Sequence, residues 1–191
     1  MKKIFLAILF IGFTSFSQST ESLKLATKKY YEANYLMDFE LIISNLYPKM
    51  VETIGKESLL DTVERFYENE EYRLREQLET LPFQYDEIKK IEGKTFCVIT
   101  FRNPIRYFFE TKLTAETASA KAIWLKETNK TKDVTFEPKR NSFNVRRQST
   151  YVAVIDETTN NEWTFFNLDD ANQLMAFKTL MSESIKKALG L

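Results

Sequence analysis

The hydrophobic positions in the first part of this chain recur every three or four residues. This spacing predicts amphipathic helices, because it places the apolar side chains on one face. Asp38 offers an N-cap for the second helix, Pro48 is expected to kink or divide that helix, and Gly55 is a plausible stop. The three predicted helices cover residues 23–37, 39–54 and 59 to about 78.

From residue 81 the pattern changes to β-rich segments separated by turns. Glu92-Gly93 is typical of a hairpin turn, and Asn103-Pro104 predicts a break or bulge. A helix over residues 117–127 and a final helix over 170–189, capped by Asp169 or Asp170, interrupt and follow the strands. The predicted strands cover residues 83–91, 94–102, 106–113, 134–136, 143–156 and 162–167.

Segregated helices and sequential antiparallel strands predict a single α+β domain, in which helices cover one face of a curved, mainly antiparallel sheet. Two stretches then resemble the NTF2-like (cystatin-like, cone-shaped) superfamily. They are the end of the second helix, YPKMV at residues 47–51, and the last hairpin, YVAVID at 151–156 followed by WTFFN at 163–167. The resemblance covers most of residues 21–168 and implies a cone with an additional C-terminal helix.

The N-terminus predicts a secretory signal peptide over residues 1–17. Lys2 and Lys3 precede an apolar run at residues 4–13, and Ser15 and Ser17 occupy the small positions before a cut at Gln18. The Phe-Ser-Gln ending resembles signal peptides of the Bacteroidetes bacteria. The alternative is an uncleaved anchor, although the apolar run is short for a membrane span. With cleavage, residues 18–191 form an exported domain without a stable membrane anchor, in the periplasm or outside the cell.

Composition removes several kinds of chemistry. The chain has no His and one Cys, so imidazole-based catalysis, the usual zinc sites and an intramolecular disulfide are excluded. Cys97 lies in an apolar strand and is expected to be buried. The full chain has 27 basic and 27 acidic residues, and removal of residues 1–17 takes away Lys2 and Lys3, which leaves a net charge of −2. Nucleic acid is therefore a disfavoured partner.

The NTF2-like resemblance implies a pocket between sheet and helices. It also implies that the isomerases and cyclases of this superfamily use a pocket carboxylate as general base and a Tyr or protonated acid as oxyanion donor. The weak catalytic candidates here are Glu110, Asp156, Tyr107 and Tyr151. The alternative interpretation is that Asp156 begins a hairpin turn and that Glu110 is an exposed strand residue.

A second set of candidates is basic and aromatic. Arginine forks suit carboxylates and phosphates, and tryptophan rings suit apolar ligands. The alternative is a solvated strand edge whose charges prevent edge pairing, with the tryptophans in the core. The ligand-binding candidates are Arg102, Arg106, Arg146, Arg147, Trp124 and Trp163.

The leading hypothesis is an exported, non-catalytic NTF2-like domain that binds a small apolar or anionic ligand or a partner protein, and that forms a homodimer through its sheet. One alternative is an isomerase or dehydratase that uses a pocket carboxylate and Tyr, without metal or other cofactor. Another alternative is a structural dimerisation module with a filled core.

Overall fold

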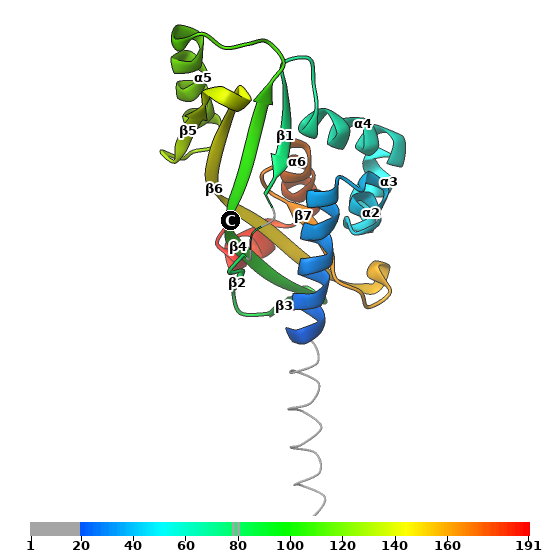
Figure 1. Cartoon of the computed structure of the whole chain (residues 1–191). Helices are drawn as coiled ribbons and strands as arrows, with labels where there is room; N and C mark the ends of the chain where they lie inside the picture. Colours follow the sequence, from blue (N-terminus) through cyan, green and yellow to red (C-terminus); the bar gives the residue numbers. More distant parts are fainter. Residues whose placement is uncertain (1–19, 78, 80) are drawn as a thin grey trace, which may run out of the picture.

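The computed structural model describes residues 20–77, 79 and 81–191. The predicted signal peptide, residues 1–17, lies outside the described residues. The helices of the first part precede a sheet of seven antiparallel strands, and two further helices follow it (Figure 1). The predicted α+β class, with N-terminal helices on a curved antiparallel sheet and an added C-terminal helical part, is confirmed.

The helical signals in the first part act as predicted. The described part of the N-terminal helix spans residues 20–36. Asp38 caps α2 (Phe39–Ser44) by accepting a hydrogen bond from the Leu41 amide at 3.0 Å. Pro48 divides the second predicted helix, because it starts α3 (Pro48–Ile54) at a position that needs no amide hydrogen. Gly55, with φ of 90°, separates α3 from α4 (Lys56–Tyr67).

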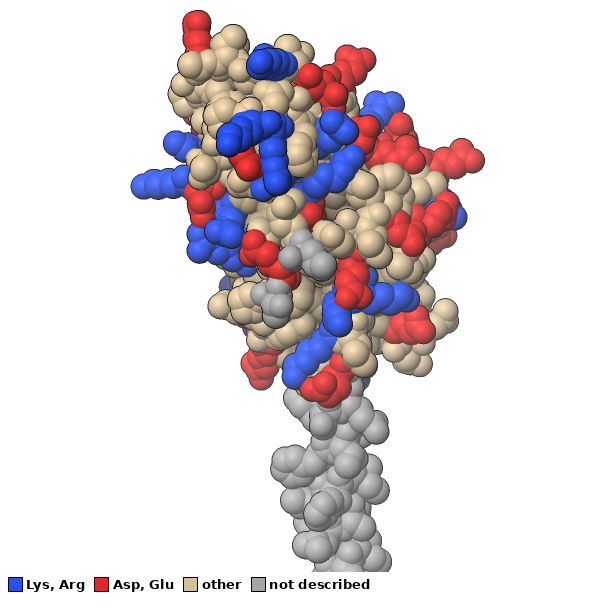
Figure 2. All heavy atoms as spheres, in the orientation of Figure 1, with Lys and Arg blue, Asp and Glu red and all other residues tan. Residues whose placement is uncertain are grey.

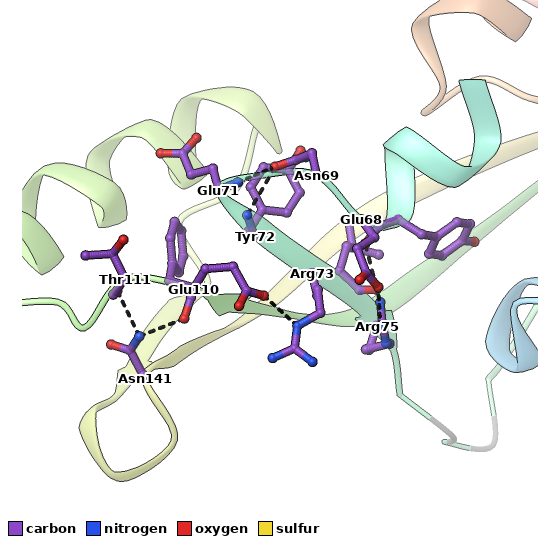
Figure 3. Close-up of polar contacts among 12 residues, drawn as sticks. Glu68, Asn69, Glu71, Tyr72, Arg73, Arg75, Glu110, Thr111 and Asn141 are labelled. Atoms are coloured by element: carbon purple, nitrogen blue, oxygen red, sulfur yellow. Dashed lines mark hydrogen bonds and ion pairs between the residues drawn. The ribbon is translucent and has the colours of Figure 1, made fainter. Parts of the chain in front are cut away.

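The predicted extension of the third helix to about residue 78 is wrong. The helix ends at Tyr67, and the Asn69 side chain accepts from the amides of Glu71 and Tyr72, which turns the chain into strand β1 (Tyr72–Glu76) (Figure 3). Side chains of β1 alternate, with Leu74 and Glu76 buried. The polar composition allows a helix, but pairing with residues 105–109 decides for β structure.

Two long antiparallel strands form the centre of the sheet, β4 (Lys94–Phe109) and β6 (Ser142–Ile155). β1 pairs with the second half of β4. The first half of β4 pairs with β2 (Gln84–Tyr85) and β3 (Lys89–Ile91), which replace the one strand predicted over residues 83–91. On the other side, β6 pairs with β5 (Val134–Glu137) and β7 (Thr164–Asn167).

The predicted break at Asn103-Pro104 is also wrong, since β4 runs through it. The Pro104 carbonyl accepts from the Gln77 amide at 2.9 Å, so this edge of Pro104 faces the end of β1. The nitrogen and the carbonyl of a strand residue point to the same side. The missing donor of Pro104 therefore costs no bond to β6, and proline is tolerated.

The remaining helices begin at side-chain caps. Thr114 caps α5 (Ala115–Thr128), and Asp170 caps α6 (Ala171–Leu180). The final helix is two helices instead of one, because the chain is extended at Met181 and Ser182 caps α7 (Glu183–Leu189). This break shifts the helical phase, so that Leu189 is buried and the predicted inward residue Ala188 is exposed.

Helices cover both faces of one half of the sheet, and not only one face as predicted. Phe165 and Phe166 are consecutive in β7 and point to opposite faces. Tyr30 of the N-terminal helix stacks on Phe165 with ring centroids 4.7 Å apart, whereas Phe177 of α6 contacts Phe166 at 5.4 Å. Covering on both sides explains the uninterrupted apolar runs at residues 96–99 and 151–154, which are buried.

No helix among residues 20–77, 79 and 81–191 has the length and apolarity needed to cross a bilayer.

Candidate functional site

A belt of polar side chains crosses the middle of the sheet face that the N-terminal helix covers. Glu76 ends β1, Asn103 lies on β4, and Arg147 and Ser149 lie on β6; all four are buried. Asn103 and Arg147 are direct cross-strand partners. Asp169, in the turn before α6, pairs with Arg147. We call Glu76, Asn103, Arg147, Ser149 and Asp169 the interior polar cluster.

Arg147 is held from several elements at once. Its Nη2 lies 3.1 Å from Asp169 Oδ2, and its Nη1 donates to Asn129 Oδ1 at 3.2 Å. Tyr107 donates to the same Asn129 oxygen, and the guanidinium lies over the Phe66 ring. Burial opposes the charge of Arg147, but Asp169 and other neighbours raise its pKa, so the guanidinium stays charged.

Glu76 is the carboxyl of the cluster that has no ion pair within the described part of the chain. Asn103 Nδ2 donates to its Oε1 at 3.3 Å. Burial raises the pKa of Glu76 to about 7, and the charge of Asp169 adds to this, while Asn103 and Arg147 act in the opposite direction. Near neutral pH this carboxyl therefore changes its protonation state readily, as a general acid or base needs to do.

Tyrosines surround the cluster from the helix side and from the sheet. Tyr67 of α4 donates to Asn34 Oδ1 at 2.9 Å, and Asn34 donates to the Tyr30 carbonyl. Burial, followed by the negative charge of neighbours that include Glu76, raises the pKa of Tyr30, Tyr67 and Tyr151. These phenols are therefore neutral hydrogen-bonding groups at physiological pH.

Several buried polar atoms at this place have no hydrogen-bond partner within the described part of the chain. Buried polar groups are normally paired, and leaving one unpaired costs about 1–3 kcal/mol. A polar molecule with both donors and acceptors would satisfy such a set. The atoms are Glu76 Oε2, Asn103 Oδ1, Arg147 Nε, Ser149 Oγ and Tyr151 Oη.

A surface groove of about 830 Å³ lies between the N-terminal helix and the segment that follows β1. The Tyr31 ring lines this groove, and its hydroxyl donates to the carbonyl of Gln77, the residue after Glu76, at 3.0 Å. Phe83 packs edge-on against Tyr31 and against Phe101 beneath it. The described lining is Lys24, Lys28, Tyr31, Glu32, Glu79, Leu81, Pro82, Phe83 and Tyr85.

The four catalytic candidates from the sequence do not come together. Tyr107 and Tyr151 are buried beside the interior polar cluster. Glu110 is exposed and pairs with Arg73 at 2.7 Å on the edge of the sheet (Figure 3). Asp156 accepts hydrogen bonds from the Thr158 amide and from Tyr47 Oη, and so caps the turn after β6. Asp156 has the position of the alternative interpretation, and Glu110 is exposed as that interpretation expects but lies directly after β4 and not in the strand.

The arginine candidates divide between the two faces of the sheet. Arg146 and Arg147 are neighbours in β6 and point to opposite faces. Each outward arginine meets a carboxylate: Arg102 pairs with Asp133, Arg106 with Glu137 and Arg146 with Glu79. On the side shown in Figure 2, basic side chains gather near α5 and β6, and acidic ones over α2–α4.

The tryptophan candidates lie in packing positions. Trp124 of α5 contacts the rings of Tyr72 and Tyr107, with centroids 5.8 and 6.2 Å away. Trp163 is buried, and its Nε1 donates to Ser22 Oγ at 3.2 Å. Neither indole has a hydrogen bond or ring contact to the interior polar cluster in the described residues.

Sequence reasoning missed Glu76, because its segment was assigned to a helix. A signal was present: YRLRE at residues 72–76 alternates, and Glu76 stands where the alternation places an inward side chain. Asn103 was missed as well, because the predicted break at Asn103-Pro104 gave it no position in a strand. Arg147 was named, but its separation from Arg146 follows only once the strand and its buried face are known.

Among the described residues, no group of three or more Cys, Asp or Glu side chains is arranged to hold a metal ion. Comparison with protein-family models and with curated proteins found no match.

Proposed function

We propose that this chain is an exported binding domain that holds a small polar molecule in the interior polar cluster. The observation that carries the proposal is the set of unpartnered buried atoms on three adjacent strands, at Glu76, Asn103 and Arg147. Two cross-strand neighbours and the end of a third strand bring these atoms to one place. A core that served packing alone would be more stable with apolar side chains at these positions.

The architecture supports a relation to NTF2-like cones as a further part of the proposal. In such cones a curved antiparallel sheet closes around a ligand, with helices across its inner face. Here the N-terminal helix and α4 supply Tyr30 and Tyr67 opposite the polar belt of the sheet. The route of the ligand is part of the proposal: it enters by the groove beside Tyr31, and the support for this is that Tyr31 both lines the groove and donates to the carbonyl of Gln77, the residue after Glu76.

Native mass spectrometry and thermal unfolding test the binding function. We expect the purified chain to retain a small molecule, or to gain thermal stability with a member of a panel of neutral, anionic and cationic compounds. Ser149→Ala should reduce that gain. Ser142→Ala is the matched control, because Ser142 is equally buried and equally lacks a hydrogen-bond partner among the described residues, but lies on the opposite face of β6. A bare chain that no panel member stabilises would overturn the proposal and favour a structural module with a filled core.

The titration of Glu76 favours a second candidate, a cofactor-free isomerase or dehydratase. With a pKa of about 7, Glu76 is suited to take a proton from a substrate, and Tyr151 is a neutral donor nearby for a developing oxyanion. Turnover should then follow the ionised fraction of Glu76, and Glu76→Gln should reduce kcat by at least about 100-fold while substrate still binds. Binding without turnover across a panel of small carbonyl compounds and hydroxy acids would count against this candidate.

Export is the remaining part of the proposal. Its support is the order of residues 1–17, positive, apolar and then small. N-terminal sequencing of material secreted by a bacterial host should find a chain that starts at Gln18. An intact Met1 on the exported protein would overturn cleavage.

A further inference from the structure

We infer that the molecule bound by the interior polar cluster is a small organic cation, an amine in its ammonium form that also carries an oxygen acceptor. The ammonium lies against Glu76, and the oxygen accepts from Arg147. This inference rests on the proposed function, since it names the ligand class of the same site.

The net charge of the cluster favours a cationic ligand. Arg147 and Asp169 neutralise each other at 3.1 Å, and their side chains are only 9% and 14% exposed. Glu76 accepts a hydrogen bond from the Asn103 amide and has no ion pair with any residue that the structure describes. With Glu76 ionised the three groups therefore carry one net negative charge. An ammonium ligand brings the buried total to zero, whereas a carboxylate or phosphate would add to the charge that burial penalises.

The buried polar atoms that lack partners among the described residues match an ammonium group together with an oxygen acceptor. Glu76 Oε2 and Asn103 Oδ1 are acceptors without donors, and Tyr151 and Ser149 have hydroxyls that accept as well as donate. An ammonium offers three donors in a compact group. Arg147 Nε is the one obligate donor of the set, and it requires an oxygen on the ligand.

The tyrosine rings around the cluster also favour a cation. Tyr30, Tyr67 and Tyr151 are buried within electrostatic range of Glu76. Tyrosine rings attract cations through the negative potential of their faces, and a neutral phenol does not compete with the carboxylate for the positive charge.

Protonation of Glu76 links this binding to pH. The groups that face Glu76 are Tyr30 and Tyr31 of the N-terminal helix, Tyr67 of α4, Asn103 of β4, Arg147 and Tyr151 of β6, and Asp169 before α6. The tyrosines stay neutral and Arg147 stays charged. Glu76 is therefore the group that must lose a proton when the ammonium binds near neutral pH.

Isothermal titration of the purified chain with three small probes, each with two carbons and a hydroxyl, tests the inference. Ethanolamine carries an ammonium and a hydroxyl, ethylene glycol is its neutral analogue, and glycolate is an anionic analogue. We expect ethanolamine to bind most tightly. Its association constant should rise about 30-fold between pH 5.5 and pH 8, because Glu76 is mostly protonated at the lower pH. Titration at pH 6 in buffers of different ionisation enthalpy should show release of about one proton.

Two variants test whether the pH dependence of ethanolamine binding comes from Glu76. Glu76→Gln should abolish the pH dependence and weaken ethanolamine at least about 10-fold at pH 8. Glu110→Gln removes an exposed carboxylate on the sheet edge and should change neither. If Glu76→Gln does not fold, as judged by circular dichroism, the three probes and the proton release on the unaltered chain decide the question.

The outcomes separate the ligand class from the proposed function. Tighter binding of glycolate or ethylene glycol, reduced by Ser149→Ala, would overturn the cation and leave interior binding supported. Ethanolamine binding that is independent of pH and of Glu76 would also overturn the inference. If no probe binds, the inference is overturned, and the broader panel with native mass spectrometry decides the proposed function separately.

Discussion

Arg147 on β6 and Asp169 before α6 form an ion pair inside the domain, with Nη2 of one 3.1 Å from Oδ2 of the other. The contact joins the central strand of the sheet to the turn that starts the C-terminal helices. Arg147 also donates to Asn129 at the end of α5. One side chain therefore connects three segments that are separate in the sequence, and the charge of Asp169 offsets the cost of burying the guanidinium.

Loss of Arg147 should destabilise the domain strongly. Arg147→Met leaves Asp169 largely buried without its counter-charge, which costs about 3–5 kcal/mol of unfolding free energy. Arg102→Gln is the control, because Arg102 and Asp133 form an exposed pair, with side chains 63% and 40% exposed. Such pairs contribute less than about 1 kcal/mol. Urea denaturation measures both variants, and equal losses would contradict the buried role of Arg147.

Glu76→Gln should stabilise the folded state increasingly as the pH rises. The folded pKa of Glu76 is raised from 4.5 to about 7, so the folded state holds a proton that the unfolded state releases between these values. Stability from this group therefore falls as the pH rises through that window. Glutamine mimics the protonated acid, and the variant should gain up to about 3 kcal/mol over the natural chain above pH 7, with little difference below pH 4.5. The check is urea denaturation across pH 4–8, with Glu110→Gln as the reference; a constant difference would disprove the raised pKa.

Tyr47→Phe tests the turn after β6. Tyr47 is buried, and its hydroxyl donates to Asp156 Oδ2 at 2.6 Å. Burial alone would raise the pKa of Asp156, but hydrogen bonds from Thr158 and Tyr47 outweigh it and lower the pKa. The bond thus stabilises the fold above the ordinary pKa of Asp156, and this contribution is lost as the pH falls through the folded pKa.

We expect Tyr47→Phe to lower the unfolding free energy by about 1–3 kcal/mol at pH 7 and by less at pH 2.5. Denaturant titrations at the two pH values measure the difference. A loss of the same size at both values would show that the hydroxyl acts through packing and not through the ionised carboxylate.

Cys97 should be unreactive in the folded protein. Its side chain is fully buried, its thiol donates to the Asp86 carbonyl at 3.3 Å, and burial raises its pKa to about 12. Thiolate is the reactive form, and at pH 8 a rise from 9 to about 12 lowers its fraction about 1000-fold. A thiol reagent should modify the chain only after unfolding in guanidinium, and rapid labelling of the native chain would contradict this position.

Local signals in the sequence were sufficient for the first helices. Asp38 acts through its side-chain cap, and Pro48 and Gly55 act through their backbone geometry, so the helix boundaries they set were predicted and are confirmed. The strand at Tyr72–Glu76 was not predicted, because a short polar segment satisfies a helix and a strand equally well. The partner strand that decides for β structure lies more than 25 residues further along the chain.

The candidate site was predictable only in fragments. Arg147 and Tyr151 were named from the sequence, but Glu76 and Asn103 were hidden by a misassigned helix and a misassigned break. From the sequence alone, Glu110 and Asp156 are equally plausible as catalytic carboxylates. The fold places one on an exposed edge and the other at a turn, and neither placement follows from neighbours in sequence.

Four properties followed from the amino-acid sequence alone: the α+β class, the helix boundaries at Asp38, Pro48 and Gly55, the absence of imidazole chemistry and the burial of Cys97. These properties depend on composition or on contacts within a few residues. That Glu76, Asn103 and Arg147 share the buried face of the sheet while Arg146 faces outward follows only from the folded chain. The physical reason is that strand register and pleat set which side chains share a face, and burial among distant segments then sets their charge.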